Sequence, residues 1–163
     1  MKFAKKFLAV VLAGVLALAM LTACGGSAAT DVTIYNAIMA ERQARGKEKV
    51  ERLEAAEQLY EETARLLAER AAGESITSEA INTAGQTAEA SLKKMVVDGK
   101  NVTFKHKSMS GVFDEKSFKA SLAGGNGWQW ITEDDYDYIG VVCVDKNGKN
   151  GTILLAITLV DDE

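Results

Sequence analysis

The spacing of hydrophobic residues changes along the chain and divides it into two halves. Apolar residues recur at three- and four-residue steps between residues 49 and 72, which is the period of an amphipathic helix. The same period, over shorter stretches, predicts helices at residues 31–45 and 78–97. Beyond residue 98 the period becomes two, or a segment is apolar throughout, as in β-strands. We therefore predict a helical first half and a strand-rich second half.

Polar residues and glycines mark the ends of the predicted helices. Asp31 or Thr33 can cap the first helix, because either side chain can accept a hydrogen bond from a free backbone N–H group. Gly73 ends the second helix, and Ser75 or Ser78 can cap the third. We expect three separate helices joined by short loops.

Two runs near the C-terminus predict a β-hairpin. Residues 138–144 and 152–160 are rich in β-branched residues, and the glycine-containing segment 145–151 joins them. Both runs are nearly apolar throughout, so we expect them in the middle of a sheet that is covered on both faces. The expected fold class is α+β, with a mostly antiparallel sheet covered by helices.

The segment between the helices and the hairpin has a mixed pattern. Residues 101–107 alternate polar and apolar side chains and predict a strand. Asp114 can cap a short helix over residues 115–123, which the following glycines end. Residues 128–131 contain two tryptophans and are expected to form an edge strand or a loop.

The N-terminus has the features of a secretory signal. A basic start at Met1–Lys6 precedes the unbroken apolar run Phe7–Leu21. That run is too short to cross a bilayer comfortably, and its flanks are those of a signal peptide. An uncleaved anchor is the alternative interpretation.

The end of this run, Leu21-Thr22-Ala23-Cys24, resembles the lipobox of bacterial lipoproteins. The resemblance implies that residues 1–23 are removed and that the Cys24 thiol is acylated. Cys24 then begins a short flexible tether at residues 24–30, and the lipid holds the protein on the outside of the cell membrane. The only other cysteine, Cys143, lies in a predicted strand and is interpreted as a small buried side chain. An ordinary signal peptide followed by a chance cysteine is the alternative.

Composition and charge exclude some function classes. The 163 residues are 47% hydrophobic and 26% charged, which is not typical of a disordered chain. Residues 1–23 carry three lysines and no acid, so their removal shifts the net charge from −4 to −7. An acidic domain lacks the basic surface that phosphate backbones require, so we expect no nucleic-acid partner. The concentrated run Glu133-Asp134-Asp135 is interpreted as a solvated surface or as a contact for a cation or basic partner.

Residues after the tether resemble a known family at several points. Met39–Gly46 is similar to the "N-x-x-R-x-x-x-G" opening of bacterial CAP-superfamily domains, the relatives of cysteine-rich secretory, antigen 5 and pathogenesis-related proteins. Met39 stands where asparagine is usual. Val50 matches the apolar position that follows, and Ala56 and Ala64 match the small residues of the family's next helix.

The C-terminal part resembles the end of the same family. Tyr136–Val141 is similar to its closing strand, in which an aromatic residue precedes Ile-Gly-Val, and Gly151–Val160 is similar to the partner strand. The resemblance covers both ends of residues 31–163 and is poor between them. It implies that residues 31–163 form one CAP-like domain with an α-β-α sandwich.

The resemblance also implies a cleft, in which family members place two histidines and two acids that can hold a divalent metal. This chain has one histidine, His106, with Glu115 or Glu133 as the candidate acids. We therefore predict no metal site and no cofactor. Trp128 is a further cleft candidate, because Trp128 and Trp130 share one face if their segment is extended and can then contact a sugar or a lipid. The alternatives are an exposed strand residue for His106 and core packing for the tryptophans.

Three functions are compatible with these features. The first is a membrane-tethered, non-catalytic CAP-like domain that binds an envelope ligand or protein outside the cytoplasm. The second is a structural or assembly lipoprotein that docks another envelope protein through the acidic helix face at Glu54–Glu69. The third is a metal-assisted hydrolase that uses His106 and Glu115. The missing second histidine favours a function without catalysis.

Overall fold

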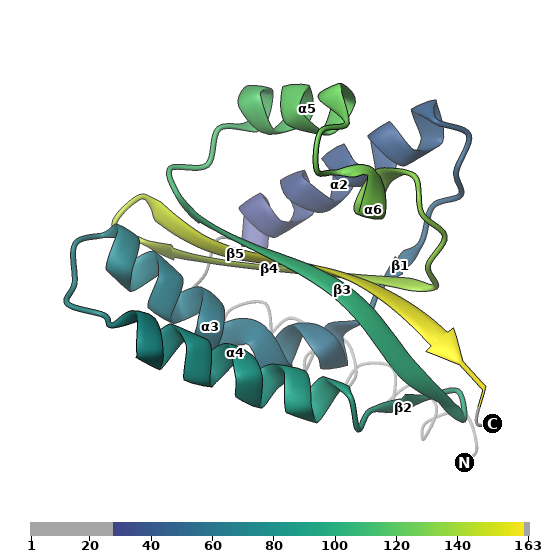
Figure 1. Cartoon of the computed structure of the whole chain (residues 1–163). Coiled ribbons are helices and arrows are strands. Elements are labelled where there is room, and N and C mark those ends of the chain that lie inside the picture. Colours follow the sequence, from purple (N-terminus) through teal and green to yellow (C-terminus); the bar gives the residue numbers. More distant parts are fainter. Residues whose placement is uncertain (1–27, 162–163) are drawn as a thin grey trace, which may run out of the picture.

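A five-stranded mixed sheet forms the centre of the protein in the computed structural model, which describes residues 28–161 (Figure 1). The predicted signal peptide, Cys24 and residues 25–27 lie outside the described residues. Across the sheet, the strands follow the order β1 (Glu51–Arg52), β4 (Tyr138–Lys146), β5 (Lys149–Val160), β3 (Lys100–Gly111) and β2 (Val96–Val97). The predicted α+β class and the mostly antiparallel sheet are confirmed, since only the β1–β4 pair is parallel.

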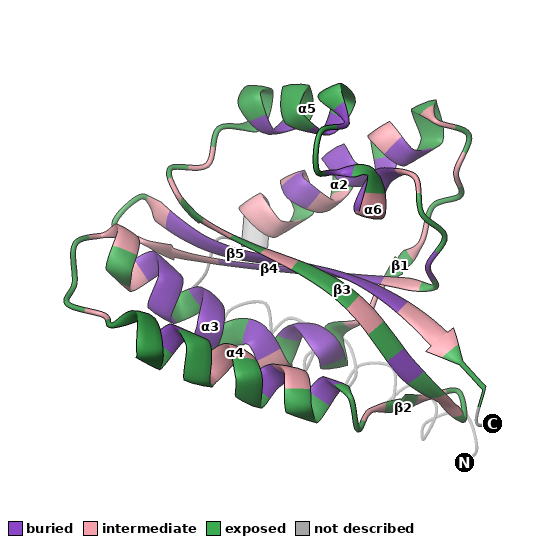
Figure 2. Ribbon diagram, in the orientation of Figure 1, coloured by how far each residue is buried: buried purple, intermediate pink, exposed green. Residues whose placement is uncertain are grey.

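Five helices within the described residues cover the two faces of this sheet (Figure 1). Helices α3 (Glu54–Ala71) and α4 (Ser78–Leu92) lie on one face. Helices α2 (Ala28–Ala44), α5 (Glu115–Gly124) and α6 (Gln129–Thr132) lie on the other. The central strands β4 and β5 are therefore buried on both sides, as their continuous apolar sequences predict (Figure 2).

Two hydrophobic clusters fill the space between the helices and the sheet. On the α3 side, Tyr60 and Leu67 pack against Ile153 and Leu155. On the α2 side, strand and helix residues pack around the aromatic rings of Phe118, Trp128 and Tyr136. Phe118 belongs to α5, whereas Trp128 and Tyr136 belong to the segment that connects α5 to β4, so this cluster fixes the position of α6 and its loop.

The predicted hairpin is confirmed, but its turn is shorter than the sequence pattern indicates. Both strands extend into the segment 145–151, and only Asn147 and Gly148 remain outside them. Their φ angles are 54° and 73°, so they form the two-residue turn with left-handed backbone that matches the twist of paired strands. Asn and Gly are the residues that adopt this conformation most readily.

Tertiary pairing shortens the second and third predicted helices. The second begins at Glu54 instead of residue 49, because Glu51 and Arg52 pair with Tyr138 and Ile139 as strand β1. The third ends at Leu92 instead of residue 97, since residues 96–97 pair with β3 as β2.

Two predictions at helix ends differ from the structure in their capping residues. Thr77, and neither Ser75 nor Ser78, caps α4 by accepting a hydrogen bond from the Ala80 N–H. The first helix begins at Ala28, inside the segment expected to be a tether, and Asp31 lies within it. At α5 the prediction is confirmed, because the Asp114 carboxylate accepts from the Ser117 N–H at 2.7 Å. Hydrogen bonding from the side chain of Ser117, together with this backbone bond, lowers the pKa of Asp114.

Candidate functional site

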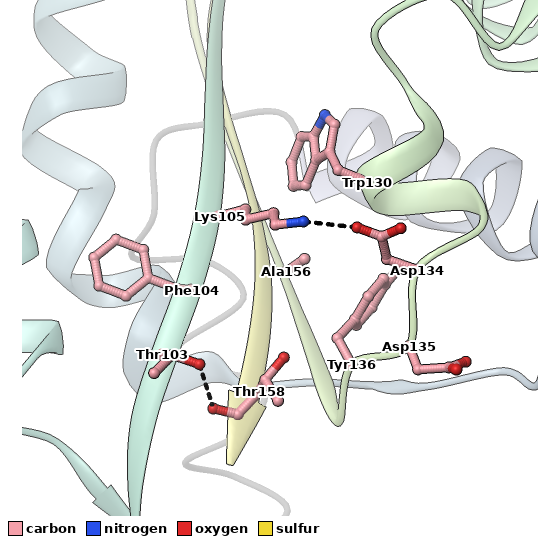
Figure 3. Close-up of a pocket in the computed structure, with 9 residues that line it drawn as sticks. All are labelled: Thr103, Phe104, Lys105, Trp130, Asp134, Asp135, Tyr136, Ala156 and Thr158. Carbon is pink, nitrogen blue, oxygen red and sulfur yellow. Dashed lines mark hydrogen bonds and ion pairs between the residues drawn. The ribbon is translucent and has the colours of Figure 1, made fainter. Parts of the chain in front are cut away.

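A pocket of about 240 Å³ lies between the sheet and the segment around α6 (Figure 3). Its floor is formed by β3 and β5, with the Phe104 side chain turned away towards the other face of the sheet, and its wall by residues of α6 and the loop that follows (Figure 3). Nine residues line it: Thr103, Phe104, Lys105, Trp130, Asp134, Asp135, Tyr136, Ala156 and Thr158.

Buried Arg42 holds the wall of the pocket in place. Its side chain is 2% exposed and donates to the Ile131 and Asp134 carbonyl oxygens at 3.2 and 2.9 Å. It also donates to the Glu48 carbonyl, and its guanidinium lies 4.1 Å from the Tyr136 ring centroid. One side chain thus ties α2 to the loop after α6, because a guanidinium has enough donors for several carbonyls.

Tyr136, in the loop between α6 and β4, forms a further part of this wall. Its hydroxyl donates to the Ile131 carbonyl oxygen at 2.7 Å, and its ring forms part of the pocket. Burial raises the pKa of Tyr136, and the positive charge of Arg42 opposes that shift. The hydroxyl therefore remains a donor at physiological pH, and the ring is a fixed apolar surface.

An ion pair crosses the pocket between Lys105 on β3 and Asp134 after α6, with 2.7 Å between Nζ and Oδ2 (Figure 3). The two side chains are 65% and 46% exposed. Exposed pairs contribute about 1 kcal/mol or less, because water screens the charges. A ligand that offers its own charge to Lys105 can therefore replace Asp134 at low cost.

The remaining lining is aromatic or carries hydroxyl groups. Half-buried Trp130 presents its ring beside Lys105, and its Nε1–H donates to the Gly127 carbonyl oxygen at 3.2 Å (Figure 3). Thr103 donates to the Thr158 carbonyl oxygen at 3.4 Å. Pockets that enclose a whole small molecule typically measure about 300–1,000 Å³. This pocket is smaller, so it suits one side chain or one sugar ring, held by stacking on Trp130 and by charge on Lys105.

His106 points away from this pocket. Successive side chains of a strand lie on opposite faces, so Lys105 faces α6 while His106 faces α3 and α4. Its ring centroid is 6.0 Å from that of Tyr60, and its Nε2 is 3.7 Å from Glu89 Oε1. Within the described part of the chain the Tyr60 hydroxyl has no hydrogen-bond partner, and burial raises the pKa of Tyr60.

Trp128 and Trp130 do not share a face. Residues two apart in a helix point about 200° away from each other, and this segment is helical at α6, not an edge strand or a loop. Trp128 is buried against Phe118, with 5.5 Å between ring centroids, and Lys107 Nζ lies 3.9 Å from its centroid. Trp128 therefore belongs to the core, and Trp130 alone reaches the pocket.

The two candidate acids have partners outside the pocket. Glu133 pairs with Arg45, which also donates to Glu41. Glu115 lies in the first turn of α5 and pairs with Lys119, four residues later. Helix α5 lies on the sheet face opposite to His106 (Figure 1), so the structure does not bring His106 and Glu115 together. Among residues 28–161, no group of three or more histidine, cysteine or acidic side chains is arranged to hold a metal ion.

The sequence did not identify Lys105, Asp134 and Trp130 as neighbours. The run Glu133-Asp134-Asp135 is the signal that could have found them, because its three carboxylates each meet a different cation. Asp134 pairs with Lys105 across the pocket and Asp135 with Lys47 at its rim. The pairing depends on how α6 folds back over β3, which no local pattern indicates.

A second polar cluster covers the outer edge of β4 beyond its short pairing with β1. Glu57 accepts two hydrogen bonds from Arg52, at 2.7 and 2.9 Å, and a third from the Val141 N–H at 2.8 Å. Arg52 also donates to the Val141 carbonyl oxygen at 2.8 Å. These two side chains take the place of a neighbouring strand, so this edge is closed.

Asp31 extends the same cluster to Cys143. Its carboxylate accepts from the Cys143 backbone N–H and lies 3.8 Å from Arg52. Burial raises the pKa of Asp31 to about 7, although the charge of Arg52 opposes the shift. The side chain of Cys143 is itself buried, as predicted, and accepts a hydrogen bond from Thr152.

Comparisons with protein-family models, with curated proteins and with solved structures each gave no match. Within the part of the chain that the structure describes, none of the helices combines the length and the apolar character needed to cross a membrane.

Proposed function

We propose that this chain is a lipoprotein, tethered to the outside of the cell membrane, whose domain binds an envelope ligand or protein without catalysis. The pocket beside Trp130 is the proposed binding site. The observation that carries this proposal is the combination of the half-buried Trp130 ring, an ion pair that a ligand can open, and hydroxyl groups around one small pocket. Such a lining suits recognition of one charged or polar group.

The domain at residues 31–163 is proposed to be a divergent CAP-like domain with an α-β-α sandwich. Helices on both faces of a mostly antiparallel sheet support this assignment. Arg42, from the "N-x-x-R-x-x-x-G" resemblance, supports it further, because it is the buried residue that joins α2 to the pocket wall. Gly140 of the Ile-Gly-Val match lies where a Cβ atom would be 2.7 Å from a methyl carbon of Leu155.

The tether is proposed to be the acylated Cys24 that the lipobox resemblance implies. Two or more acyl chains anchor a protein stably, since each buried methylene contributes about 0.8 kcal/mol and one chain alone is marginal. Radioactive palmitate incorporation that is lost in Cys24→Ser tests this assignment directly.

Binding in the pocket is tested with the full chain in detergent micelles. Isothermal titration against cell-wall glycan fragments, phospholipid vesicles and acidic or basic peptides should reveal saturable binding to one of these classes. Trp130→Ala and Lys105→Ala should each weaken that binding about tenfold or more, because each removes a contact worth about 1–2 kcal/mol.

His106→Ala is the matched control, since His106 lies on the opposite face of β3 and should leave binding unchanged. Trp128→Ala is unsuitable, because Trp128 is buried and its loss would destabilise the core. Absence of saturable binding across all probes, or an equal loss in His106→Ala and Trp130→Ala, would contradict the proposal.

Docking through the acidic face of α3 is the second candidate. Glu54 and Glu61 are exposed there, whereas Glu62 and Glu69 are held by Arg65 within the helix. Crosslinking from Glu54 in cells, compared with crosslinking from Trp130, separates the two candidates: a single dominant partner at Glu54 alone favours docking through α3.

A further inference from the structure

The outer edge of β3 carries backbone hydrogen-bonding groups that point away from the sheet. The backbone N–H and C=O groups of Val141 bond to the Glu57 and Arg52 side chains, so they point away from β5. In an antiparallel pair the opposite residue then also points its backbone groups away, and Leu154 therefore directs its N–H and C=O towards β3. Leu154 is opposite Lys107, which therefore bonds to β5. The alternate residues of β3 direct their N–H and C=O groups outwards: Phe104, His106, Ser108 and Ser110.

No element among the described residues covers this edge. Strand β2 pairs with β3 only at Lys100 and Asn101, and no hydrogen bond from a side chain or loop of residues 28–161 reaches the backbone of β3 between residues 104 and 110. The edge of β4 is different, because Arg52 and Glu57 satisfy it. Side chains thus satisfy the backbone groups at the β4 edge of the sheet, whereas those at the β3 edge are open to a further strand.

The charge on β3 selects the kind of strand that can pair with it. Residues 100–111 contain three lysines, one histidine and no acid, in a domain whose net charge is negative. Lys107 lies over the Trp128 ring, and Lys105 shares only the exposed pair with Asp134. A second copy of this chain would place the same basic strand opposite β3, and like charges that face each other across strands are destabilising. An acidic strand is complementary.

The structure assigns to this edge a peptide partner: we propose that β3 takes an extended, acidic segment of another envelope protein as an additional strand, beside the pocket at Trp130. This inference rests on the proposed function and names the ligand of the same site. Main-chain hydrogen bonds to the outward groups of β3 hold the segment, and alternate side chains give specificity. Acidic side chains of the added strand that face α6 reach Lys105 and Lys107, beside Trp130, and the alternate apolar side chains lie on the opposite face, with His106.

The dimensions of the site agree with an added strand. Outward groups at four alternate residues span seven positions of β3, from Phe104 to Ser110, which is about 20 Å of strand. The pocket of about 240 Å³ accepts one side chain of such a segment and is too small for a longer ligand by itself. The edge therefore supplies length and the pocket supplies selectivity.

The test measures backbone amide hydrogen exchange by NMR on the full chain in detergent micelles. The probe is an eight-residue peptide of alternating valine and glutamate, and the matched control is the same peptide with lysine in place of glutamate. We expect the acidic peptide to slow exchange at the Phe104, His106 and Ser108 amides and to leave the Val141 amide unchanged. The lysine peptide should bind at least about tenfold more weakly.

Two changes remove the main-chain contact specifically. Ser108→Pro removes an outward N–H without removing a bond to β5, a position where proline is tolerated in an edge strand. It should weaken binding about tenfold, whereas Ser108→Ala should not. Glutamate peptides methylated on alternate backbone nitrogens test the same contact on the unaltered protein, so the result does not depend on how the proline variant folds.

Each outcome decides the inference. Slower exchange at the β3 edge that is lost with the methylated peptide supports strand addition. If Trp130→Ala abolishes peptide binding but methylation of the peptide backbone does not weaken it, strand addition is overturned. The proposed function of the pocket stands in that case. Equal binding of the lysine peptide overturns the acidic specificity, and edge protection that grows with protein concentration alone identifies a second copy as the occupant.

Discussion

Asp31 and Arg42 are both charged residues with little exposure, and they differ in how well neighbouring groups compensate their charge. Several carbonyl oxygens and the Tyr136 ring surround the guanidinium of Arg42 and compensate its positive charge. Asp31 has Arg52 at 3.8 Å, but Arg52 gives its two shorter bonds to Glu57. For one oxygen of Asp31, Oδ1, residues 28–161 offer no hydrogen-bond partner. Its carboxylate is therefore the less well compensated charge.

The stability of the protein should depend on the protonation of Asp31. Its pKa is about 7 in the folded state and 3.8 as the ordinary value, so the folded state holds the proton over the interval between them. The contribution is fully present below pH 4 and is lost as the pH rises through 7, because ionisation then occurs in the buried site. The free energy of unfolding of the wild type, relative to Asp31→Asn, should fall by at most about 1.4 kcal/mol per pH unit over this range.

Urea denaturation at pH 4, 5.5, 7 and 8 measures this difference. Asp161→Asn is the matched control, since Asp161 is an exposed acid near the C-terminus and should leave the pH profile unchanged. Parallel profiles for the wild type and Asp31→Asn would show that the carboxyl ionises as readily in the folded protein as in the unfolded chain.

Replacing Arg42 should lower stability and loosen the pocket wall. Arg42→Met removes the donor of one buried hydrogen bond, to the Ile131 carbonyl oxygen, and of two partly buried ones, to Glu48 and Asp134. A buried carbonyl group that loses its donor costs about 1–3 kcal/mol. We expect a loss of about 3 kcal/mol in the free energy of unfolding. Arg65→Met, which breaks exposed pairs on α3, should cost less than about 1 kcal/mol. Comparable losses of unfolding free energy in Arg42→Met and Arg65→Met would contradict the structural role of Arg42.

At the scale of elements, the close contact of α3 with β5 gives a sharp test. A Cβ atom at Gly151 would lie 2.6 Å from the Ala68 backbone nitrogen, so the helix backbone would have to move. Gly151→Ala should therefore lower the free energy of unfolding by more than about 2 kcal/mol, as overpacking does. Gly148→Ala, in the hairpin turn, meets no atom within 4 Å and has only its positive φ to oppose it, at about 1 kcal/mol.

Urea denaturation of both variants under the same conditions shows which of them lowers the free energy of unfolding more. If Gly151→Ala were no more destabilising than Gly148→Ala, α3 would lie farther from the sheet than the structure has it. Far-ultraviolet circular dichroism of each variant checks that the helices are retained.

Long elements were predictable and short ones were not. Apolar periodicity over many residues located α3, and apolar β-branched runs located β4 and β5, because the burial of a whole face favours one structure strongly. Strands β1 and β2 are two residues each and form only where another strand offers partners. Helix α6 is four residues long; Arg42 holds it from a distant part of the chain, and Tyr136 holds it from the loop that follows. Such contacts have no local sequence signal.

The same limit applies to the candidate site. The alternation around His106 predicts a strand, which the structure confirms, but it does not indicate which face of that strand α6 covers. His106 and not its neighbour is therefore predicted as the cleft candidate. Lys105, one position earlier, is the residue that faces the pocket. An error of one residue on a strand moves a side chain to the other face, which is why strand predictions locate a site less well than they locate a fold.

At the scale of the whole molecule, the proposed lipid and the proposed peptide lie at opposite edges of the sheet. Helix α2 begins at Ala28 and contacts the β4 edge through Asp31, whereas β3 is two strands away, at about 10 Å. Three residues separate Cys24 from Ala28, so the chain between them spans at most about 14 Å. A lipid on Cys24, as proposed, would therefore draw the β4 edge towards the bilayer and leave the β3 edge facing away.

This orientation can be measured with fluorescent labels on single cysteines. Val32, which is 50% exposed at the start of α2, and Ser108, on the open edge of β3, each provide a labelling position, while Cys143 is buried. In vesicles with nitroxide-bearing headgroups, a label at Val32→Cys should be quenched more strongly than one at Ser108→Cys, because it lies closer to the bilayer. The difference should disappear in Cys24→Ser. Stronger quenching at Ser108→Cys would show that the β3 edge faces the membrane. This edge would then be inaccessible to a peptide from another envelope protein.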